Sequence, residues 1–209
     1  MSNTKYKSYY SIVMLNSVYP LSKALNKFLS ESLVCTHYKK GEYIVKQDGV
    51  CNRLHLIRQG LVRGYFDYDN KEITTWVSTD NQMVTSILGY FSNQPAQENI
   101  QCLEETYTES LSYEDMHYAL DNFKEMSILN RILMEEYYVF SEHRAFMARI
   151  PTARGRYKYF LKIMSPQIID RLPKKYMASL LNMRPETLSR IENSFEYDLK
   201  SKSKLTYIK

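Results

Sequence analysis

The sequence changes character at about Tyr113, and this change constrains the fold more than any other feature. From Cys35 to Tyr113, short apolar or alternating runs are separated by turn residues, and from Tyr113 almost to the end apolar residues recur at helical spacing. Strands in one part of the chain and helices in another indicate an α+β fold with an antiparallel sandwich or barrel, because a parallel sheet needs strands and helices that alternate.

Turn residues mark the ends of the expected strands. Glycine-containing turns at 40–42 and 47–49 flank one apolar run, residues 58–60 separate two others, and a polar turn at 67–70 precedes the fourth. The expected strands are Tyr43–Val45, Leu54–Ile57, Leu61–Phe66 and Ile73–Val77. A helix with Pro20 near its start is expected before them, over residues 19–34.

The longest helical pattern covers residues 125–150 and carries two apolar stripes. One contains Met126, Leu129, Leu133, Tyr137, Phe140 and Met147, and the other contains Ile128, Ile132, Val139, Phe146 and Ile150. Such a helix must bury two faces. We expect one face to lie on the strand-rich part and the other on the same helix of a second subunit. Pro151 then marks a hinge to a shorter helix, from Thr152 to about Met164.

Charge is unevenly distributed along the chain, whose net charge is +5. Residues 151–209 hold 13 Lys and Arg against 5 Asp and Glu, a net charge of +8, and residues 1–150 hold 15 against 18, a net charge of −3. A nearly neutral body joined to a small cationic module is typical of a protein that meets a polyanion. Chance variation between small domains is the alternative interpretation.

Within the cationic part, residues 173–191 show the pattern of a helix-turn-helix. Short helices are expected at Pro173–Leu181 and Pro185–Asn193, each with proline at its first position. Residues 181–184 supply a tight turn in which Asn182 tolerates a left-handed backbone. A small core is expected from Met177, Ala178, Leu181, Met183, Leu188 and Ile191.

The second helix of this motif enters the DNA major groove, so its polar face is the candidate interface. That face carries Arg184, Glu186, Thr187, Ser189 and Arg190, which suit base edges and phosphates. Lys174 and Lys175 add attraction that does not depend on sequence. The alternative is a helical hairpin with a solvated face, in a ligand-sensing or protein-interaction module that no longer reads DNA.

The sequence lacks the motifs that other classes of function require. There is no Gly-x-Ser-x-Gly motif and no phosphate-binding glycine loop, so we expect no enzyme. The four histidines are scattered, and the cysteines Cys35, Cys51 and Cys102 are odd in number without Cys-x-x-Cys spacing, so no metal, iron–sulfur cluster or other cofactor is expected. Without an apolar run of 18 residues or a signal peptide, we expect a cytoplasmic protein away from membranes.

Over about residues 20–195 the chain resembles the Crp/Fnr family of bacterial transcription regulators. The most specific part is Leu172-Pro173, Ala178-Ser-Leu-Leu and Arg184-Pro-Glu-Thr-Leu-Ser-Arg-Ile191. Supporting pieces are Lys39-Lys40-Gly41-Glu42, Gly60-Leu-Val-Arg63, Leu103-Glu104 and Arg156-Tyr157. The combination looks most like the short regulators of this family from Bacteroidetes-like bacteria.

The resemblance implies three parts: a cyclic-nucleotide-binding-like antiparallel β-roll of jelly-roll type over residues 1–124, a dimerisation helix over 125–150, and a winged helix-turn-helix over 151–209. It implies a homodimer that binds double-stranded DNA and RNA polymerase. By motif, Glu186 and Arg190 occupy base-reading positions and Thr187 a phosphate-contacting one, whereas Pro185 stands where the family has another arginine. The few residues after Ile191 leave room for only a short or frayed wing.

The sequence departs from the family at the effector site. Members that bind cyclic AMP hold the ribose with a Gly-Glu pair and the phosphate with an Arg-Ser pair. Residues 83–100 contain no arginine or lysine, and Ser86 stands where the glutamate is expected. Because a buried phosphate without a charge-assisted donor is poorly compensated, we expect that cyclic AMP does not bind in the usual way. The effector stays unknown.

Overall fold

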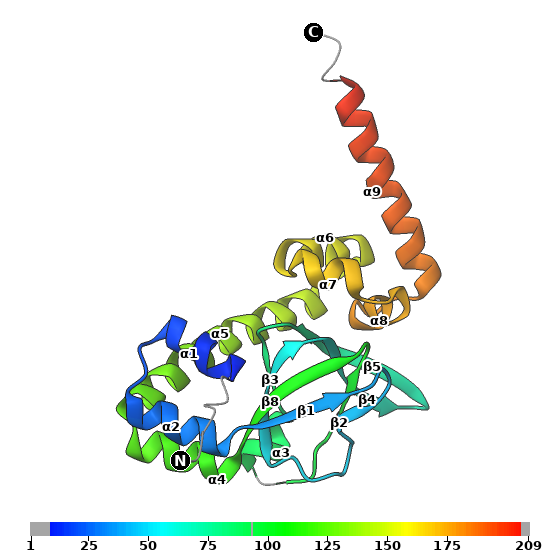
Figure 1. Cartoon of the computed structure of the whole chain (residues 1–209). Helices are drawn as coiled ribbons and strands as arrows, with labels where there is room; N and C mark the ends of the chain where they lie inside the picture. The colour runs from blue at the N-terminus through cyan, green and yellow to red at the C-terminus, as the bar shows by residue number, and fades with distance from the viewer. Residues whose placement is uncertain (1–8, 93, 206–209) are drawn as a thin grey trace.

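The computed structural model describes the backbone of residues 9–92 and 94–205, and side chains up to Phe195. Its centre is a β-roll of two four-stranded antiparallel sheets (Figure 1). The first sheet has the order β1-β8-β3-β6, formed by Val34–Tyr38, Thr106–Ser112, Arg53–Gln59 and Met83–Val84. The second has the order β2-β7-β4-β5, formed by Tyr43–Val45, Asn99–Cys102, Leu61–Tyr68 and Lys71–Thr79. The predicted strands and the antiparallel α+β fold are confirmed.

Helices cover one end of this β-roll and continue beyond it. The N-terminal part contributes α1 (Tyr10–Val18), α2 (Lys23–Ser32) and the short α3 (Ile87–Ser92), and α4 (Tyr113–Asn122) follows β8. The long helix α5 is Lys124–Arg149, and α6 (Ala153–Ile163), α7 (Pro166–Arg171), α8 (Lys174–Leu180) and α9 (Pro185–Leu205) follow it. Figure 1 shows α9 projecting away from the rest of the molecule.

Local sequence signals account for several boundaries. The Ser22 hydroxyl accepts from the Leu25 backbone N–H and so starts α2, which lies inside the helix predicted over 19–34. Asp69 and Asn70, at φ 49° and 59°, form the polar turn between β4 and β5. Sequence analysis did not single out α1 or α7, which are short and carry no strong apolar periodicity.

The two stripes of α5 have different surroundings. Met126, Leu129 and Met147 from the first stripe are buried against the body, as predicted. From the second stripe, Val139 and Phe146 are 56% and 50% exposed. The helix ends at Arg149, two residues before Pro151, in agreement with the expected hinge. The part of the second stripe at Val139 and Phe146 thus remains uncovered in the single chain.

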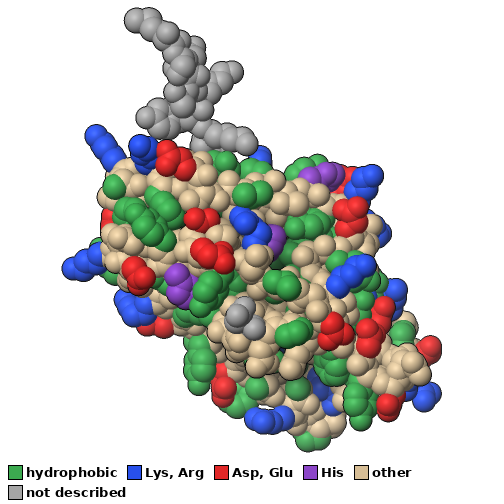
Figure 2. All heavy atoms as spheres, turned by 90° about the horizontal axis from the view of Figure 1, so that it is seen from below, with side chains coloured by type: hydrophobic (Ala, Val, Ile, Leu, Met, Phe, Trp, Pro, Cys, Tyr) green, Lys and Arg blue, Asp and Glu red, His purple; other side chains and the backbone are tan. Residues whose placement is uncertain are grey.

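The surface of the body has no dominant charge on the side seen in Figure 2. There, Lys and Arg side chains lie interspersed with Asp and Glu side chains, which agrees with the small net charge of residues 1–150. Within the described residues, no helix is both long enough and apolar enough to span a bilayer.

Candidate nucleic-acid interface and sensor pocket

The helix-turn-helix is formed by α8 and α9. Leu181 ends α8, and Asn182 has a φ of +49°, so the predicted left-handed turn residue is confirmed. Pro185 is the first residue of α9, as predicted. Pro173, by contrast, caps α8 from outside, and the first helical residue is Lys174.

The second helix is longer than predicted. Sequence analysis placed it at Pro185–Asn193 with a short wing after it, but α9 continues to Leu205. Among residues 9–92 and 94–205, no strand follows β8, so the wing prediction is wrong for the described chain. The physical reason is that no glycine or proline occurs after Pro185 to end the helix.

The predicted small core holds the two helices together. Met177, Ala178, Leu181 and Leu188 are buried, and Met183 and Ile191 pack against the same cluster from partly exposed positions. Ala178 and Leu188 are both fully buried, which fixes the face of α9 that points inward. Helical geometry then requires the side chains on the other side of α9 to point outward.

Arg156 of α6 links the turn of the helix-turn-helix to the hinge at Pro151 through hydrogen bonds. Its guanidinium donates to the carbonyls of Leu181 and Asn182, at 2.6 and 3.0 Å, and to those of Ile150 and Pro151, at 2.8 and 3.1 Å. These carbonyls lie at helix ends or in turns, where no intrahelical donor is available. One side chain thereby positions the start of α9 relative to the end of α5.

The outward face of α9 and Arg184, just before the helix, carry candidate DNA-binding residues. Arg184, Glu186, Ser189 and Arg190 are exposed, and Thr187 is half-buried. Arg190 makes a long contact, 3.4 Å, from Nε to the Glu186 carbonyl of its own helix. These five residues thus lie within about two helical turns at the start of α9, with Arg190 outside the subunit interior.

The two predicted lysines lie at the start of α8 and are exposed. Lys174 Nζ is 2.7 Å from a carboxylate oxygen of Glu192 on α9, so its charge is engaged within the chain. Lys175 Nζ lies 4.4 Å from the centre of the Tyr176 ring. Lys175 is consequently the better placed of the two to meet a phosphate.

The inner side of the motif is docked on the β-roll, which sequence analysis missed. The Ser179 hydroxyl accepts from the Thr74 backbone N–H at 3.0 Å and lies 3.2 Å from the Glu72 carbonyl on edge strand β5. The buried Arg63 guanidinium lies between the rings of Tyr65 and Tyr176, at 4.0 and 3.8 Å. The docking joins segments about a hundred positions apart, which local periodicity does not reveal.

A second contact between these parts comes from Arg171 of α7. Its guanidinium pairs with Asp80 at 2.9 Å and with Glu104, and it donates to the Thr79 hydroxyl at 2.8 Å. Bonding to the two carboxylates raises the pKa of Arg171. The module is therefore held to the β-roll by charge-assisted hydrogen bonds as well as by apolar contact.

Part of the segment expected to hold an effector is packed as core. Ser86 is buried and its backbone N–H points to the Cys51 thiol at 3.4 Å, while Tyr90 and Ala96 pack in one cluster with Val84 and other apolar residues. A side chain at Gly89 would lie 3.0 Å from Cys51 Cβ. Buried side chains in the described part of this segment thus lie where the family resemblance places a phosphate-binding site.

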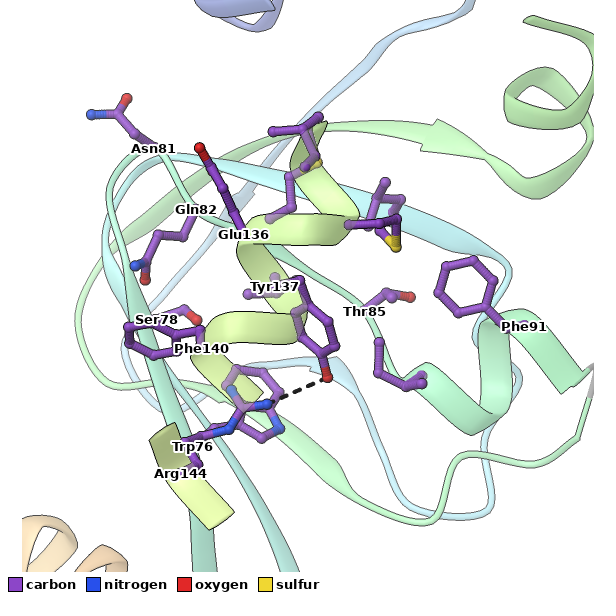
Figure 3. Close-up of a pocket in the computed structure, with 16 residues that line it drawn as sticks. Trp76, Ser78, Asn81, Gln82, Thr85, Phe91, Glu136, Tyr137, Phe140 and Arg144 are labelled. Carbon is purple, nitrogen blue, oxygen red and sulfur yellow. Dashed lines mark hydrogen bonds between the residues drawn. The ribbon is translucent and has the colours of Figure 1, made fainter. Parts of the chain in front are cut away.

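A pocket lies between the β-roll and α5, and part of its wall comes from the same segment, with Thr85 and Phe91 among its lining residues (Figure 3). At its side the Trp76 indole N–H donates to a Glu98 carboxylate oxygen at 2.8 Å. Burial raises the pKa of Glu98, although this hydrogen bond and the charge of Arg144 act in the opposite direction.

No metal centre is assembled by the residues that the structure describes, since no three His, Cys, Asp or Glu side chains gather within reach of one ion. Burial lowers the pKa of His55 to about 4, helped by the charge of Arg53, and His55 Nδ1 lies 3.3 Å from the Thr108 hydroxyl. His55 is therefore a neutral member of the core at pH 7.

Comparison with known proteins agrees with this architecture. Residues 35–123 match the cyclic nucleotide-binding domain family. A search of curated protein sequences gave no match.

Solved structures with the same fold include several regulators. FixK2 from Bradyrhizobium japonicum has a TM-score of 0.67 at 15% identity, with 79% of this chain and 85% of that chain covered. A CooA mutant from Carboxydothermus hydrogenoformans has a TM-score of 0.67 at 18% identity, with coverages of 88% and 84%. A protein described as a Crp/Fnr family transcriptional regulator, from Eubacterium rectale, has a TM-score of 0.64 at 19% identity, with both chains covered to 85%.

Residues 35–123 are thus similar to the cyclic nucleotide-binding domain, and the chain has the fold of Crp/Fnr transcription regulators. The Bacteroidetes-like subgroup stays a prediction.

Proposed function

We propose that this chain is a non-enzymatic, homodimeric transcription regulator of the Crp/Fnr type that reads a specific DNA sequence with α9. The observation that carries the proposal is the outward face of α9, where Glu186 and Arg190 are exposed while Leu188 on the inner face is buried, with Arg184 exposed just before the helix begins at Pro185. Arginine suits guanine edges, a glutamate accepts from a cytosine amine, and the start of a helix attracts phosphate. A cytoplasmic location and RNA polymerase as a further partner belong to the same proposal.

The test is selection of genomic DNA fragments by the purified full chain at physiological salt, followed by sequencing. We expect one recurrent pseudo-palindromic site, and we expect the Arg184→Ala/Arg190→Ala variant to lose it. A matched control removes two exposed charges from the β-roll, Lys40→Ala/Arg58→Ala, and is expected to select the same site. Equal, weak binding by the wild type and the α9 variant would favour the alternative, a sensing or interaction module whose motif does not read DNA.

The dimer is supported by exposed residues of α5. From its second stripe, Val139 and Phe146 are 56% and 50% exposed, and the adjacent Tyr138 is 73% exposed. Large apolar or aromatic side chains exposed near one another on a monomer mark an interaction surface. In sedimentation experiments we expect a dimer, and a monomer for Val139→Glu/Phe146→Glu. A wild-type chain that sediments as a monomer at all concentrations would contradict this part of the proposal.

The last part of the proposal is that this chain does not bind cyclic AMP in the usual way. Its support is the absence of arginine and lysine from residues 83–100 together with the packing of Ser86 and Tyr90 in the core. Calorimetric titration with cyclic AMP is expected to give no saturable heat. Micromolar binding would contradict it.

A further inference from the structure

The pocket between the β-roll and α5 is small and its walls are mostly apolar. Its volume is about 220 Å³. Aromatic rings come from Trp76, Phe91, Tyr137 and Phe140, and aliphatic side chains come from Leu54 and Leu133, among others. Pockets for drug-sized ligands run from about 300 to 1,000 Å³, so this one suits a smaller molecule with an apolar body.

One basic side chain, Arg144 of α5, lies among the pocket-lining residues. Its guanidinium is 5.4 Å from the centre of the Tyr137 ring and 5.9 Å from that of Phe140, and Nη2 donates to the Tyr137 hydroxyl in a long contact of 3.4 Å. Figure 3 shows Arg144, Tyr137 and Trp76 at one end of the pocket. A guanidinium has five N–H donors, so most of the hydrogen-bonding capacity of Arg144 is unused by these contacts.

The acidic groups nearby do not neutralise Arg144 directly. Among the described residues, no carboxylate oxygen lies within 4 Å of its guanidinium nitrogens. Glu98 is close enough for the charge of Arg144 to act on its pKa, but its carboxylate is engaged by the Trp76 indole at 2.8 Å. Glu136, which also lines the pocket, lies at the far rim beside Asn81 and Gln82 (Figure 3).

We propose that this pocket binds a small organic monocarboxylate, with its apolar body among the aromatic rings and its carboxylate on Arg144. Planar guanidinium and carboxylate groups form paired hydrogen bonds, and these are strongest where apolar walls exclude water. A nucleotide fits the pocket less well, because Arg144 is the single cation on its walls and the space is small for a base, a ribose and a phosphate.

The position of the pocket couples its occupant to the DNA-binding module. Arg144 lies three residues before Met147, which is buried in the same cluster as Leu181 and Leu188 of the helix-turn-helix. A ligand that engages Arg144 therefore contacts the helix that leads into this module. This consequence rests on the proposed function, whereas ligand binding itself does not.

The test uses the full chain and its own reporter, because Trp76 is the only tryptophan and lines the pocket. Tryptophan fluorescence is titrated with octanoate and, as a neutral probe of the same length, with octan-1-ol, without DNA. We expect saturable binding of octanoate, about tenfold or more tighter than that of octan-1-ol, since the alcohol lacks the charge-assisted hydrogen bonds.

The matched variants separate charge from pocket integrity. Arg144→Met is expected to weaken octanoate binding about tenfold while octan-1-ol binding stays unchanged, which also shows that the pocket is intact. Arg149→Met, an exposed arginine on the same helix, is expected to bind both probes like the wild type. Octanoate that binds no tighter than octan-1-ol, or equally well to Arg144→Met, overturns the proposal, as does cyclic AMP that displaces octanoate at lower concentration.

The octanoate titration and the DNA selection, taken together, show which of the two proposals fails. Octanoate binding without any DNA binding contradicts the proposed function but supports the pocket assignment. Specific DNA binding without octanoate binding contradicts the pocket assignment alone.

Discussion

The buried Arg63 of the β-roll is bonded to other side chains, whereas Arg190 on the outer face of α9 points to solvent. Arg63 in the β-roll is 1% exposed, and its guanidinium donates to Gln101 Oε1 at 2.8 and 3.0 Å and to Glu72 at 2.5 Å. Arg190 on α9 is exposed and contacts one carbonyl of its own helix at 3.4 Å. Two arginines in one chain thus have opposite surroundings.

Buried and exposed arginines are expected to affect different properties, the first stability and the second binding. A buried charge is tolerated only when its partners are present, so its removal is expected to lower the free energy of unfolding. An exposed charge contributes little to stability, so its effect is expected only when an external partner binds. Mutations in the two regions are therefore expected to separate stability from DNA binding.

The largest effect is expected for Arg63→Leu. The substitution leaves Gln101 and Thr74 without their donor and empties the space between the Tyr65 and Tyr176 rings. We expect the free energy of unfolding to fall by about 3 kcal/mol or more. Urea unfolding measures this, and Arg58→Leu on the preceding strand β3 is the exposed control. Equal losses for the two variants would remove the contrast between buried and exposed arginines.

Nearly as large an effect is expected from acid, through His55. Its pKa in the folded chain is about 4, below the ordinary value of 6.5, so the unfolded chain binds a proton first as the pH falls. The contribution of His55 is complete above pH 6.5 and is lost between pH 6.5 and 4, by about 3 kcal/mol in total.

Urea unfolding at several pH values measures this dependence. The His55→Gln variant keeps a partner for Thr108 but does not titrate, so its stability is expected to fall less steeply over the same range. Parallel pH profiles for wild type and variant would show that other groups cause the loss.

A smaller loss of stability is expected for Arg156→Met. Four carbonyl oxygens lose their donor, but the side chain is only partly buried and water can replace some of the bonds. We expect about 2 kcal/mol in thermal or urea unfolding. Lys158→Met, exposed on the same helix α6, is the control and is expected to change stability by less than about 0.5 kcal/mol.

On α9, a substitution is expected to change DNA binding and not stability. Arg190→Ala is expected to weaken specific DNA binding by about 1–3 kcal/mol while the unfolding curve stays unchanged. Electrophoretic mobility shift on the selected site, alongside urea unfolding, measures both. A variant that unfolds more easily yet binds DNA normally would place Arg190 with the structural residues instead.

The smallest effect is expected for Lys175→Ala. If Lys175 meets one phosphate, the slope of log affinity against log salt concentration becomes shallower by about 0.9. Lys174→Ala is expected to change the slope less, because Lys174 is paired with Glu192. Equal changes for both lysines would show that this ion pair opens on binding.

Local signals were sufficient to predict many elements of this fold. Turn residues located the central strands, Pro151 marked the end of α5, and Asn182 and Pro185 delimited the turn of the helix-turn-helix. The exposed face of α9 also followed from apolar spacing, because Leu188 and its neighbours orient the helix. Because no glycine or proline follows Pro185, by contrast, α9 continues to Leu205 where a wing was expected.

The tertiary structure alone decided which distant residues meet. Ser179 reaches Thr74 across 105 positions, and Arg171 reaches Asp80 across 91, although neither pair has a recognisable spacing. Arg144 likewise belongs to an apolar pocket only because α5 lies against the β-roll. Periodicity along one element specifies which face is buried, but the partner of that face depends on how elements pack. The sequence by itself therefore determined the elements and the outward face of α9, and the packing determined the docking surface and the pocket.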